Sequence, residues 1–166
     1  MERLHGALHG IYLGPLRLLA LEMYDRLNRD GTPCNLLTGE ESIPEEGAAH
    51  TASTIELACY TAHYEVAVID EAQMVTDPFR GDKWFHAIYC LNADEIHICL
   101  APEARELIVR MLESFSAPYT VVEHKRLAPL SYAGLFRKIP DAQSGDALIV
   151  FSRRAVLAVS AELEAN

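Results

Sequence analysis

The chain alternates short Val- and Ile-rich apolar runs with segments that have the spacing of amphipathic helices, and this alternation restricts its fold more than any other feature. Several runs are almost continuously apolar, which is typical of strands buried on both faces of a parallel sheet. The runs predict strands at Ile11–Leu13, Cys34–Thr38, Val66–Asp70, Glu95–Cys99, Tyr119–Glu123 and Ala147–Phe151.

The segments between these runs predict helices at Pro15–Arg29, Lys83–Leu91, Pro102–Phe115 and Arg154–Glu164. In the first segment, Pro15 suits the first helical turn and Gly31 suits a position just past the helix end. The order of strands and helices predicts an α/β domain with a mostly parallel sheet flanked by helices. Because such sheets bind ligands at the carboxyl ends of their strands, the residues that follow each strand are the first candidates for a site.

The amino-acid composition limits which nucleic-acid and membrane partners the chain can have. The 166 residues carry 14 basic and 24 acidic side chains, a net charge of −10, so any nucleic-acid site must be a local patch. No apolar run approaches the ~20 residues that cross a bilayer, and residues 1–6 lack a signal-peptide pattern. We therefore expect no membrane partner and a cytoplasmic location. The four cysteines form no C-x-x-C pair, so we expect buried, reduced thiols.

The strongest local signal is the apolar run Val66–Ile69, which is followed directly by Asp70 and Glu71. In nucleoside triphosphatases, the first acid at the end of such a strand can hold hydrated Mg²⁺. The second acid can orient or deprotonate an attacking water. Acids at strand ends also cap helices, so the pattern alone leaves a structural role open.

Short segments that resemble the motifs of one family follow each other along nearly the whole chain. They are Gly14–Glu22, Thr38–Glu41, Ser53–Glu56, Asp70–Met74, Asp77–Gly81, His124–Leu130 and Gly145–Ser152. In this order they resemble the ATP-dependent RNA helicases of the mitochondrial degradosome and their bacterial relatives, which belong to helicase superfamily two. Asp70-Glu71-Ala72-Gln73 resembles the Walker B motif of that family.

The resemblance implies a RecA-like P-loop NTPase fold, with residues 1–123 as the first helicase domain. It implies an interdomain linker at 124–145 and the start of a second RecA-like domain at 146–166. The intact parent protein would use ATP and Mg²⁺ to unwind or move along single-stranded RNA or DNA. An exoribonuclease or another degradosome protein is a further partner that the resemblance implies.

The resemblance also implies roles for individual residues. Asp70 would hold Mg²⁺ through water, Glu71 would act as the general base, and Gln73 would sense the γ-phosphate. The nucleic-acid track would be lined by Gly14, Pro15, Arg17, Thr38, Gly39, Glu40, Thr54 and Glu56.

The sequence departs from the family pattern in two places. No glycine is followed by lysine, so the Gly-Lys-Ser/Thr end of the phosphate loop is missing. Residues 1–9 match the helix after that loop, so we expect an N-terminally truncated domain that hydrolyses no ATP alone. Leu100-Ala101 stands where the family has Gly and an acid, which puts the motif that couples ATP to nucleic acid in question.

Other interpretations stay open at this point. The chain could be a non-catalytic RecA-like interaction module, or another Mg²⁺-dependent hydrolase with a third acidic ligand near Asp70 and Glu71. Trp84 could stack on a base or lie in the core, and Arg80 could position a loop or a phosphate or form a surface salt bridge. We expect the apolar run 147–151 to pack on the first domain or to pair with another chain, because exposure forgoes roughly 1.5–3 kcal/mol per large side chain.

Overall fold

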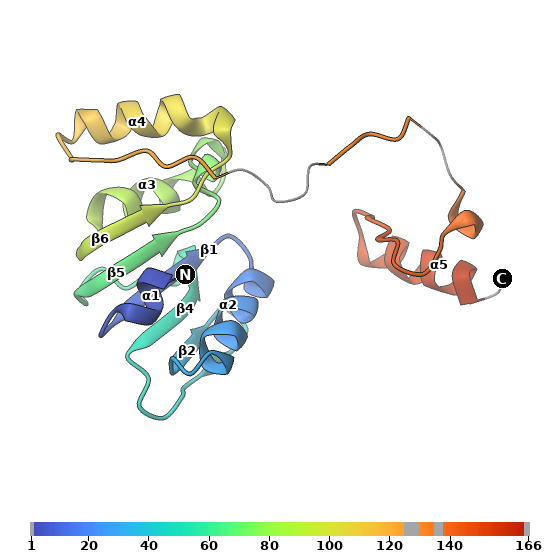
Figure 1. The fold of residues 1–166 in the computed structure, drawn as a ribbon, viewed down its shortest axis with the longest axis horizontal. Helices are drawn as coiled ribbons and strands as arrows, with labels where there is room; N and C mark the ends of the chain where they lie inside the picture. The colour runs from blue at the N-terminus through green and yellow to red at the C-terminus, as the bar shows by residue number, and fades with distance from the viewer. Residues whose placement is uncertain (1, 125–129, 135–137, 165–166) are drawn as a thin grey trace. The chain divides into compact units, whose positions relative to one another are not determined.

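The structure, a computed structural model, describes residues 2–124, 130–134 and 138–164. The chain divides into two compact units, Met1–Thr120 and Val121–Asn166. The first unit contains a six-stranded sheet in the order β3-β2-β4-β1-β5-β6 (Figure 1). All neighbouring strands are parallel except β2 and β3. The strands are β1 (Gly10–Gly14), β2 (Cys34–Leu37), β3 (Ser42–Ile43), β4 (His50–Thr54), β5 (Tyr64–Ile69) and β6 (Ala93–Ile98). This is the mostly parallel α/β architecture of a RecA-like domain, as predicted.

Helices and short 3₁₀ segments connect the strands. The first unit contains α1 (Glu2–Gly6), α2 (Arg17–Arg29), η1 (Ile55–Leu57), η2 (Ala72–Thr76), α3 (Gly81–Cys90), η3 (Pro102–Ala104) and α4 (Arg105–Ser114). The second unit contains η4 (Ile139–Asp141) and α5 (Arg153–Glu164). Among the described residues, no helix combines the length and the apolar character that a membrane span requires.

Both faces of the sheet are buried, which explains the continuous apolar runs in its central strands. Successive side chains of a strand point to opposite faces. Ile11 and Leu13 of β1 pack into a core cluster with Trp84 of α3 and Ile108 of α4. Tyr12, between them, packs into a second cluster, which also contains Leu4 of α1, Leu27 of α2, and Val66 and Val68 of β5. The sheet is therefore covered by α3 and α4 on one face and by α1 and α2 on the other.

Helix α2 ends as its sequence predicts but begins later. Gly31 has a φ of +84°, and the amide of Thr32 donates to the Leu27 carbonyl at 2.9 Å, which is a Schellman-type end. The helix starts at Arg17 instead of Pro15, with Leu16 as its extended N-cap residue. The Pro15 carbonyl therefore lies outside the helix and is free to accept a hydrogen bond from elsewhere.

Two strands of the sheet were not predicted. Strand β4 has only one apolar residue, the small Ala52, in an otherwise polar His-Thr-Ala-Ser-Thr sequence, yet it is held between β1 and β2. Strand β3 has only two residues, Ser42 and Ile43, and pairs antiparallel with β2. Backbone pairing, and not side-chain pattern, forms both strands. Strand β4 pairs with β1 and β2, which lie farther away in the sequence, whereas β3 forms a short hairpin with β2.

Two predicted strands are wrong. Residues 119–123 and 147–151 form no strand, and in the second run Ile149 is 79% and Phe151 99% exposed. The predicted strand at 147–151 is therefore wrong, whereas the expectation that this run packs on the first domain or pairs with another chain stays a prediction. An isolated strand gains nothing unless a neighbour takes up its backbone hydrogen bonds. Most of the motif at 124–130 lies outside the described residues.

The expectation for the cysteines is correct only in part. All four are free, but only Cys34 is buried, whereas Cys59, Cys90 and Cys99 are exposed. An apolar neighbourhood in the sequence does not determine burial at strand and helix ends, where these three residues lie.

Candidate functional site

The carboxyl ends of four neighbouring strands bring the predicted site segments to one edge of the sheet. In the register of β1, Gly14 pairs with Thr54 of β4, and Leu13 pairs with Ile69 of β5. Leu37 of β2 pairs with Ser53 of β4, directly before Thr54. The segments Thr38–Glu40, Thr54–Glu56, Gly14–Arg17 and Asp70–Gln73 therefore follow one another along this edge, in the order β2, β4, β1, β5.

Asp70 is held at both carboxylate oxygens. The Tyr12 hydroxyl donates to Oδ2 at 2.7 Å, and the backbone N–H of Glu71 donates to Oδ1 at 2.9 Å. Its backbone is fixed as well, since its N–H donates to Leu13 and its carbonyl accepts from Trp84 Nε1 at 2.9 Å. The N-cap residue of η2 is Glu71, and it makes no side-chain capping hydrogen bond. The Asp70 carboxylate therefore does not serve as the helix cap that the sequence left open.

Tyr12 is a residue of this site that the sequence reasoning missed. It is 3% exposed, and its ring lies against Gly14, where an added Cβ would meet the ring at 3.0 Å. Burial, and next the hydrogen bond to Asp70, raise the pKa of Tyr12 far above its usual value. The only sequence signal was the hydroxyl of Tyr12, a single polar side-chain atom in the apolar strand β1. This strand pairs with β5, after which Asp70 lies.

We expect the buried titratable groups to make the protein less stable in alkali. Burial raises the pKa of Cys34 from 9.0 to about 11 and that of Tyr64 from 10.0 to about 12, and it also raises the pKa of Tyr12. The unfolded chain loses these protons first, so the stability is fully present below pH ~9 and declines as the pH rises toward ~12, by ~1.4 kcal/mol per pH unit for each group.

Urea unfolding from about pH 8, below the usual Cys pKa, to about pH 12, above the usual Tyr pKa, checks this expectation. Tyr12→Phe and Tyr64→Phe should each flatten the decline above pH ~10, whereas Tyr132→Phe, at an 88% exposed position, should not. A decline of equal slope in all three variants would contradict the assignment.

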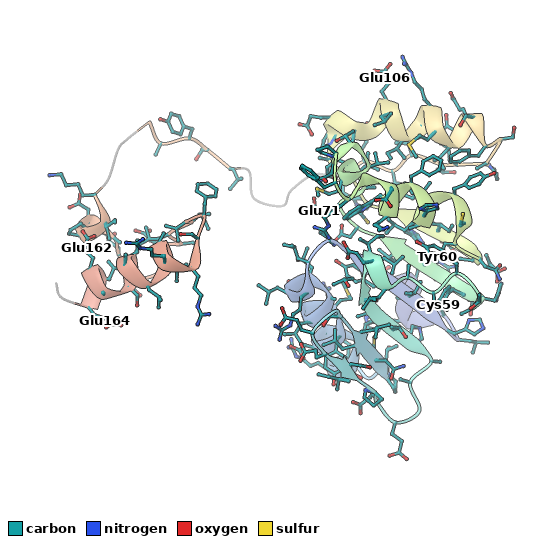
Figure 2. All side chains as sticks on the ribbon, turned by 180° about the vertical axis from the view of Figure 1, so that it is seen from behind. Cys59, Tyr60, Glu71, Glu106, Glu162 and Glu164 are labelled. Atoms are coloured by element: carbon teal, nitrogen blue, oxygen red, sulfur yellow. The ribbon has the colours of Figure 1, made fainter. Side chains whose placement is uncertain are left out.

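Glu71, labelled in Figure 2, follows Asp70 directly. Its backbone lies in the left-handed region, with φ 52° and ψ 44°. A non-glycine residue there costs of order 1–3 kcal/mol, and such residues cluster at functional sites. The Glu71 carboxylate accepts a hydrogen bond from Gln73 Nε2. Gln73 Oε1 in turn accepts from the Ala101 N–H at 3.1 Å, so Gln73 joins Glu71 to the loop after β6.

This contact bears on the departure at Leu100-Ala101. The backbone N–H of Ala101, and not a side chain, donates the hydrogen bond to Gln73. A link between the segment after β5 and the loop after β6 therefore exists without the glycine and the acid of the family pattern.

The predicted track residues are ordered mainly by contacts with each other. Arg17 donates to Glu40 and, at 2.9 Å through Nε, to Glu41. Thr38 is 5% exposed, and its hydroxyl accepts the amide N–H groups of Glu40 and Glu41, which closes the turn around Gly39. Thr54 ends β4, and Glu56 lies in η1 and accepts from Arg80. Arg17 is therefore not simply solvated, and a phosphate that binds it must compete with Glu40 and Glu41 for the guanidinium.

The residues at Asp70 fit a hydrated magnesium ion. A carboxylate has about four lone-pair positions, and the two hydrogen bonds to Asp70 leave room for water ligands. Mg²⁺ typically keeps several waters and uses one or two carboxylates. A hydrolase with a metal caged by protein needs more ligands, and the described part of the chain has no cluster of three or more His, Cys, Asp or Glu side chains for one. The third acidic ligand of that alternative is not found there.

The structure decides between the alternatives left open for Trp84 and Arg80, and both side chains make contacts within the fold. Trp84 is fully buried in the core, so it does not stack on a base. Arg80 does more than form a surface salt bridge, because it contacts Glu56, the Pro15 carbonyl and the Trp84 ring.

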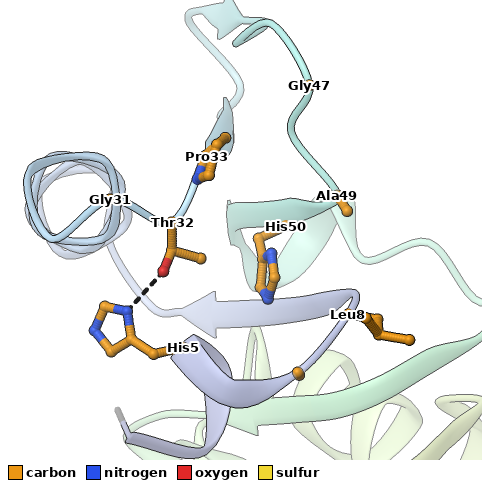
Figure 3. Close-up of a pocket in the computed structure, with 9 residues that line it drawn as sticks. His5, Leu8, Gly31, Thr32, Pro33, Gly47, Ala49 and His50 are labelled. Atoms are coloured by element: carbon orange, nitrogen blue, oxygen red, sulfur yellow. Dashed lines mark hydrogen bonds between the residues drawn. The ribbon is translucent and has the colours of Figure 1, made fainter.

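A pocket of about 280 Å³ lies at the opposite edge of the sheet (Figure 3). It is lined by residues that precede or open β1, β2 and β4, among them Leu8, Thr32 and His50, and His5 Nδ1 lies 2.8 Å from the Thr32 hydroxyl. Because α/β sheets bind ligands at the carboxyl ends of their strands, this pocket is not the expected site.

Comparisons with known proteins agree with the geometry. A family model described as the DEXQ-box helicase domain of Suv3 matches residues 1–124, and Asp70-Glu71-Ala72-Gln73 fits the letters of that description. The chain is 41% identical over 168 residues to the mitochondrial ATP-dependent RNA helicase SUV3 of Oryza sativa subsp. japonica. It is 40% identical over 174 residues to the SUV3 homolog of Drosophila melanogaster and 36% identical over 169 residues to SUPV3L1 of Homo sapiens.

These alignments cover 99–100% of this chain but only 28% of the rice protein and 22% of the other two, so the chain spans about a quarter of its relatives' length. All three relatives are named as mitochondrial, which contradicts the expected cytoplasmic location. Proteins are directed to a compartment by separate targeting segments, so the composition of a folded domain does not predict its compartment. With the family model matching three quarters of its residues, the chain belongs to the Suv3 family of DEXQ-box helicase domains.

Proposed function

We propose that this chain is a part of the first motor domain of an ATP-dependent helicase that acts on single-stranded RNA. The observation that carries the proposal is the single edge of the sheet at which Asp70, Glu71 and Gln73 lie next to the segments Gly14–Arg17, Thr38–Glu40 and Thr54–Glu56. The names of the relatives, which are ATP-dependent RNA helicases, support RNA over DNA. Residues 1–123 form the motor domain, 124–145 the linker, and 146–166 the start of a second domain.

The contacts of the two acids and Gln73 support the roles proposed for them. In the intact protein, Asp70, oriented by Tyr12, would hold the waters of a Mg²⁺ ion, and that ion would help to position and polarise ATP. Glu71, turned by its left-handed backbone, would act as the general base for water. Gln73 reports on the γ-phosphate, and its contact with Ala101 passes the change to the loop after β6. An exoribonuclease or another degradosome protein is the partner that fits a helicase of this kind.

RNA binding by the 166-residue chain tests the track. The net charge of −10 opposes binding, so we expect weak, salt-sensitive affinity for a fluorescein-labelled oligouridine, followed by fluorescence anisotropy. Arg17→Ala should weaken binding and lower the slope of log affinity against log salt by about 0.7, the value for one phosphate contact on a single strand. Glu40→Gln should strengthen binding about fivefold, because removing one charge near Arg17 changes the interaction by ~1 kcal/mol.

Arg110→Ala is the matched control. Arg110 is also exposed and paired with a glutamate, Glu106, but it lies on α4, away from the strand ends. It should leave affinity unchanged. Binding that survives Arg17→Ala with the same salt slope would show that the track is assigned wrongly.

A further inference from the structure

Arg80 joins segments that lie far apart in the sequence. Its Nη2 donates to the Pro15 carbonyl at 2.6 Å, and its Nε donates to Glu56 Oε1 at 2.8 Å. The guanidinium carbon also lies 5.4 Å from the centre of the Trp84 ring, within the range of a cation–π interaction. One side chain thus contacts the segments after β1 and β4 and the helix that follows Asp70.

Trp84 continues this set of contacts to the acid. It is fully buried, and its Nε1 donates to the Asp70 carbonyl at 2.9 Å. A short series of direct contacts therefore runs from Pro15 and Glu56 through Arg80 and Trp84 to the backbone of Asp70.

The backbone of Arg80 is fixed independently of its side chain. Asp77 Oδ1 accepts the amide N–H groups of Phe79 and Arg80 at 2.9 and 2.8 Å. The amide of Gly81 donates to the Asp77 carbonyl at 3.0 Å. The guanidinium is therefore presented from a rigid turn, and a change in Pro15 or Glu56 must move the side chain or break its hydrogen bonds.

Only arginine suits this position. A guanidinium carries its donors in a planar fork and can also stack on an aromatic ring, so it can serve a carbonyl, a carboxylate and an indole together. A lysine ammonium keeps the charge but is a compact point donor without that plane.

We propose that Arg80 is a positioning residue that couples the nucleic-acid track, through Pro15 and Glu56, to the magnesium-holding Asp70, through Trp84. This inference rests on the proposed function, because Pro15 and Glu56 belong to the track proposed there. RNA that docks on these segments changes the environment of the guanidinium, and the change reaches the indole that holds Asp70. Spatial continuity motivates the coupling, and a response at Trp84 that depends on Arg80 establishes it.

The intrinsic fluorescence of the chain offers a direct readout, since Trp84 is its only tryptophan. Unlabelled oligouridine is added to saturation, and anisotropy of a labelled oligouridine measures binding separately. We expect the wild type to bind and to change its Trp84 emission. Arg80→Ala should bind more weakly and, at saturation, lose the emission change. Arg80→Lys should regain affinity through its charge without regaining the emission change.

Glu56→Gln is a second test that leaves Arg80 and Trp84 in place. It should reduce the change in Trp84 emission, and it keeps the coupling testable if Arg80→Ala folds poorly. Arg110→Ala should behave like the wild type in both measurements. An unchanged Trp84 response in folded Arg80→Ala or in Glu56→Gln, with RNA bound, overturns the coupling and leaves the proposed function standing. Failure of the wild type to bind RNA in the anisotropy measurement overturns the proposed function, and the coupling with it.

Discussion

Replacing Gly81 with alanine is expected to lower the free energy of unfolding by about 3 kcal/mol or more, or to prevent folding, because it overpacks a site walled by backbone. A Cβ on Gly81 would lie 2.3 Å from the Val75 carbonyl oxygen and 2.9 Å from its carbon. The local chain cannot move aside easily, since the Gly81 amide donates to the Asp77 carbonyl and the Asp77 amide donates to Met74. Urea unfolding followed by circular dichroism measures the loss.

Gly6→Ala is the matched control for this substitution. Gly6 ends α1, has no positive φ, and an added Cβ there would meet nothing within 4 Å. We expect its stability to stay within about 0.5 kcal/mol of the wild type. Equal stabilities of the two variants would mean that η2 and the start of α3 are not packed as described.

Trp84→Ala is expected to cost about 3–5 kcal/mol, the range for emptying a buried aromatic site. Trp84 is the largest fully buried side chain and contributes to the cluster between the sheet and helices α3 and α4. The variant also leaves the Asp70 carbonyl without its indole donor. Trp84→Phe should cost less, because the ring keeps most of its packing and loses mainly that hydrogen bond.

Phe85→Ala tests whether burial is the cause. Phe85 is the next residue on α3 and is also aromatic, but it is 42% exposed and contacts Tyr89 and Phe115 near the surface. Thermal or urea unfolding should show a much smaller loss for Phe85→Ala than for Trp84→Ala. Similar losses would show that Trp84 is not an essential part of the core.

Strands β1 and β5 were predictable because their apolar composition itself indicates burial on both faces. Ile11–Leu13 and Val66–Ile69 are continuously apolar, and both are covered on two faces. Helix α2 was predictable at its end, where glycine alone suits the left-handed turn at Gly31 without strain. These features are local, so local residues determine them.

The missed strand β4 and the wrongly predicted strand at 147–151 differ in whether the rest of the chain provides a pairing partner. The polar β4 is a strand because β1 and β2 pair with it on either side, whereas the apolar run at 147–151 is not one because no neighbour completes it in the described residues. β-propensity expresses fit to a half-buried surface more than an intrinsic backbone preference, so it fails where the neighbours decide.

The sequence by itself determined the fold class, the family, and the position of Asp70 and Glu71 at the end of a buried strand. Only the tertiary structure decided that Tyr12 orients Asp70, that Gln73 reaches the Ala101 amide, and that Arg80 joins Pro15 and Glu56 to the buried Trp84. A hydrophobic pattern specifies which face of an element is buried, but not which polar atoms meet where elements converge. Those meetings depend on strand order and register, which link residues tens of positions apart and leave no periodic signal in the sequence.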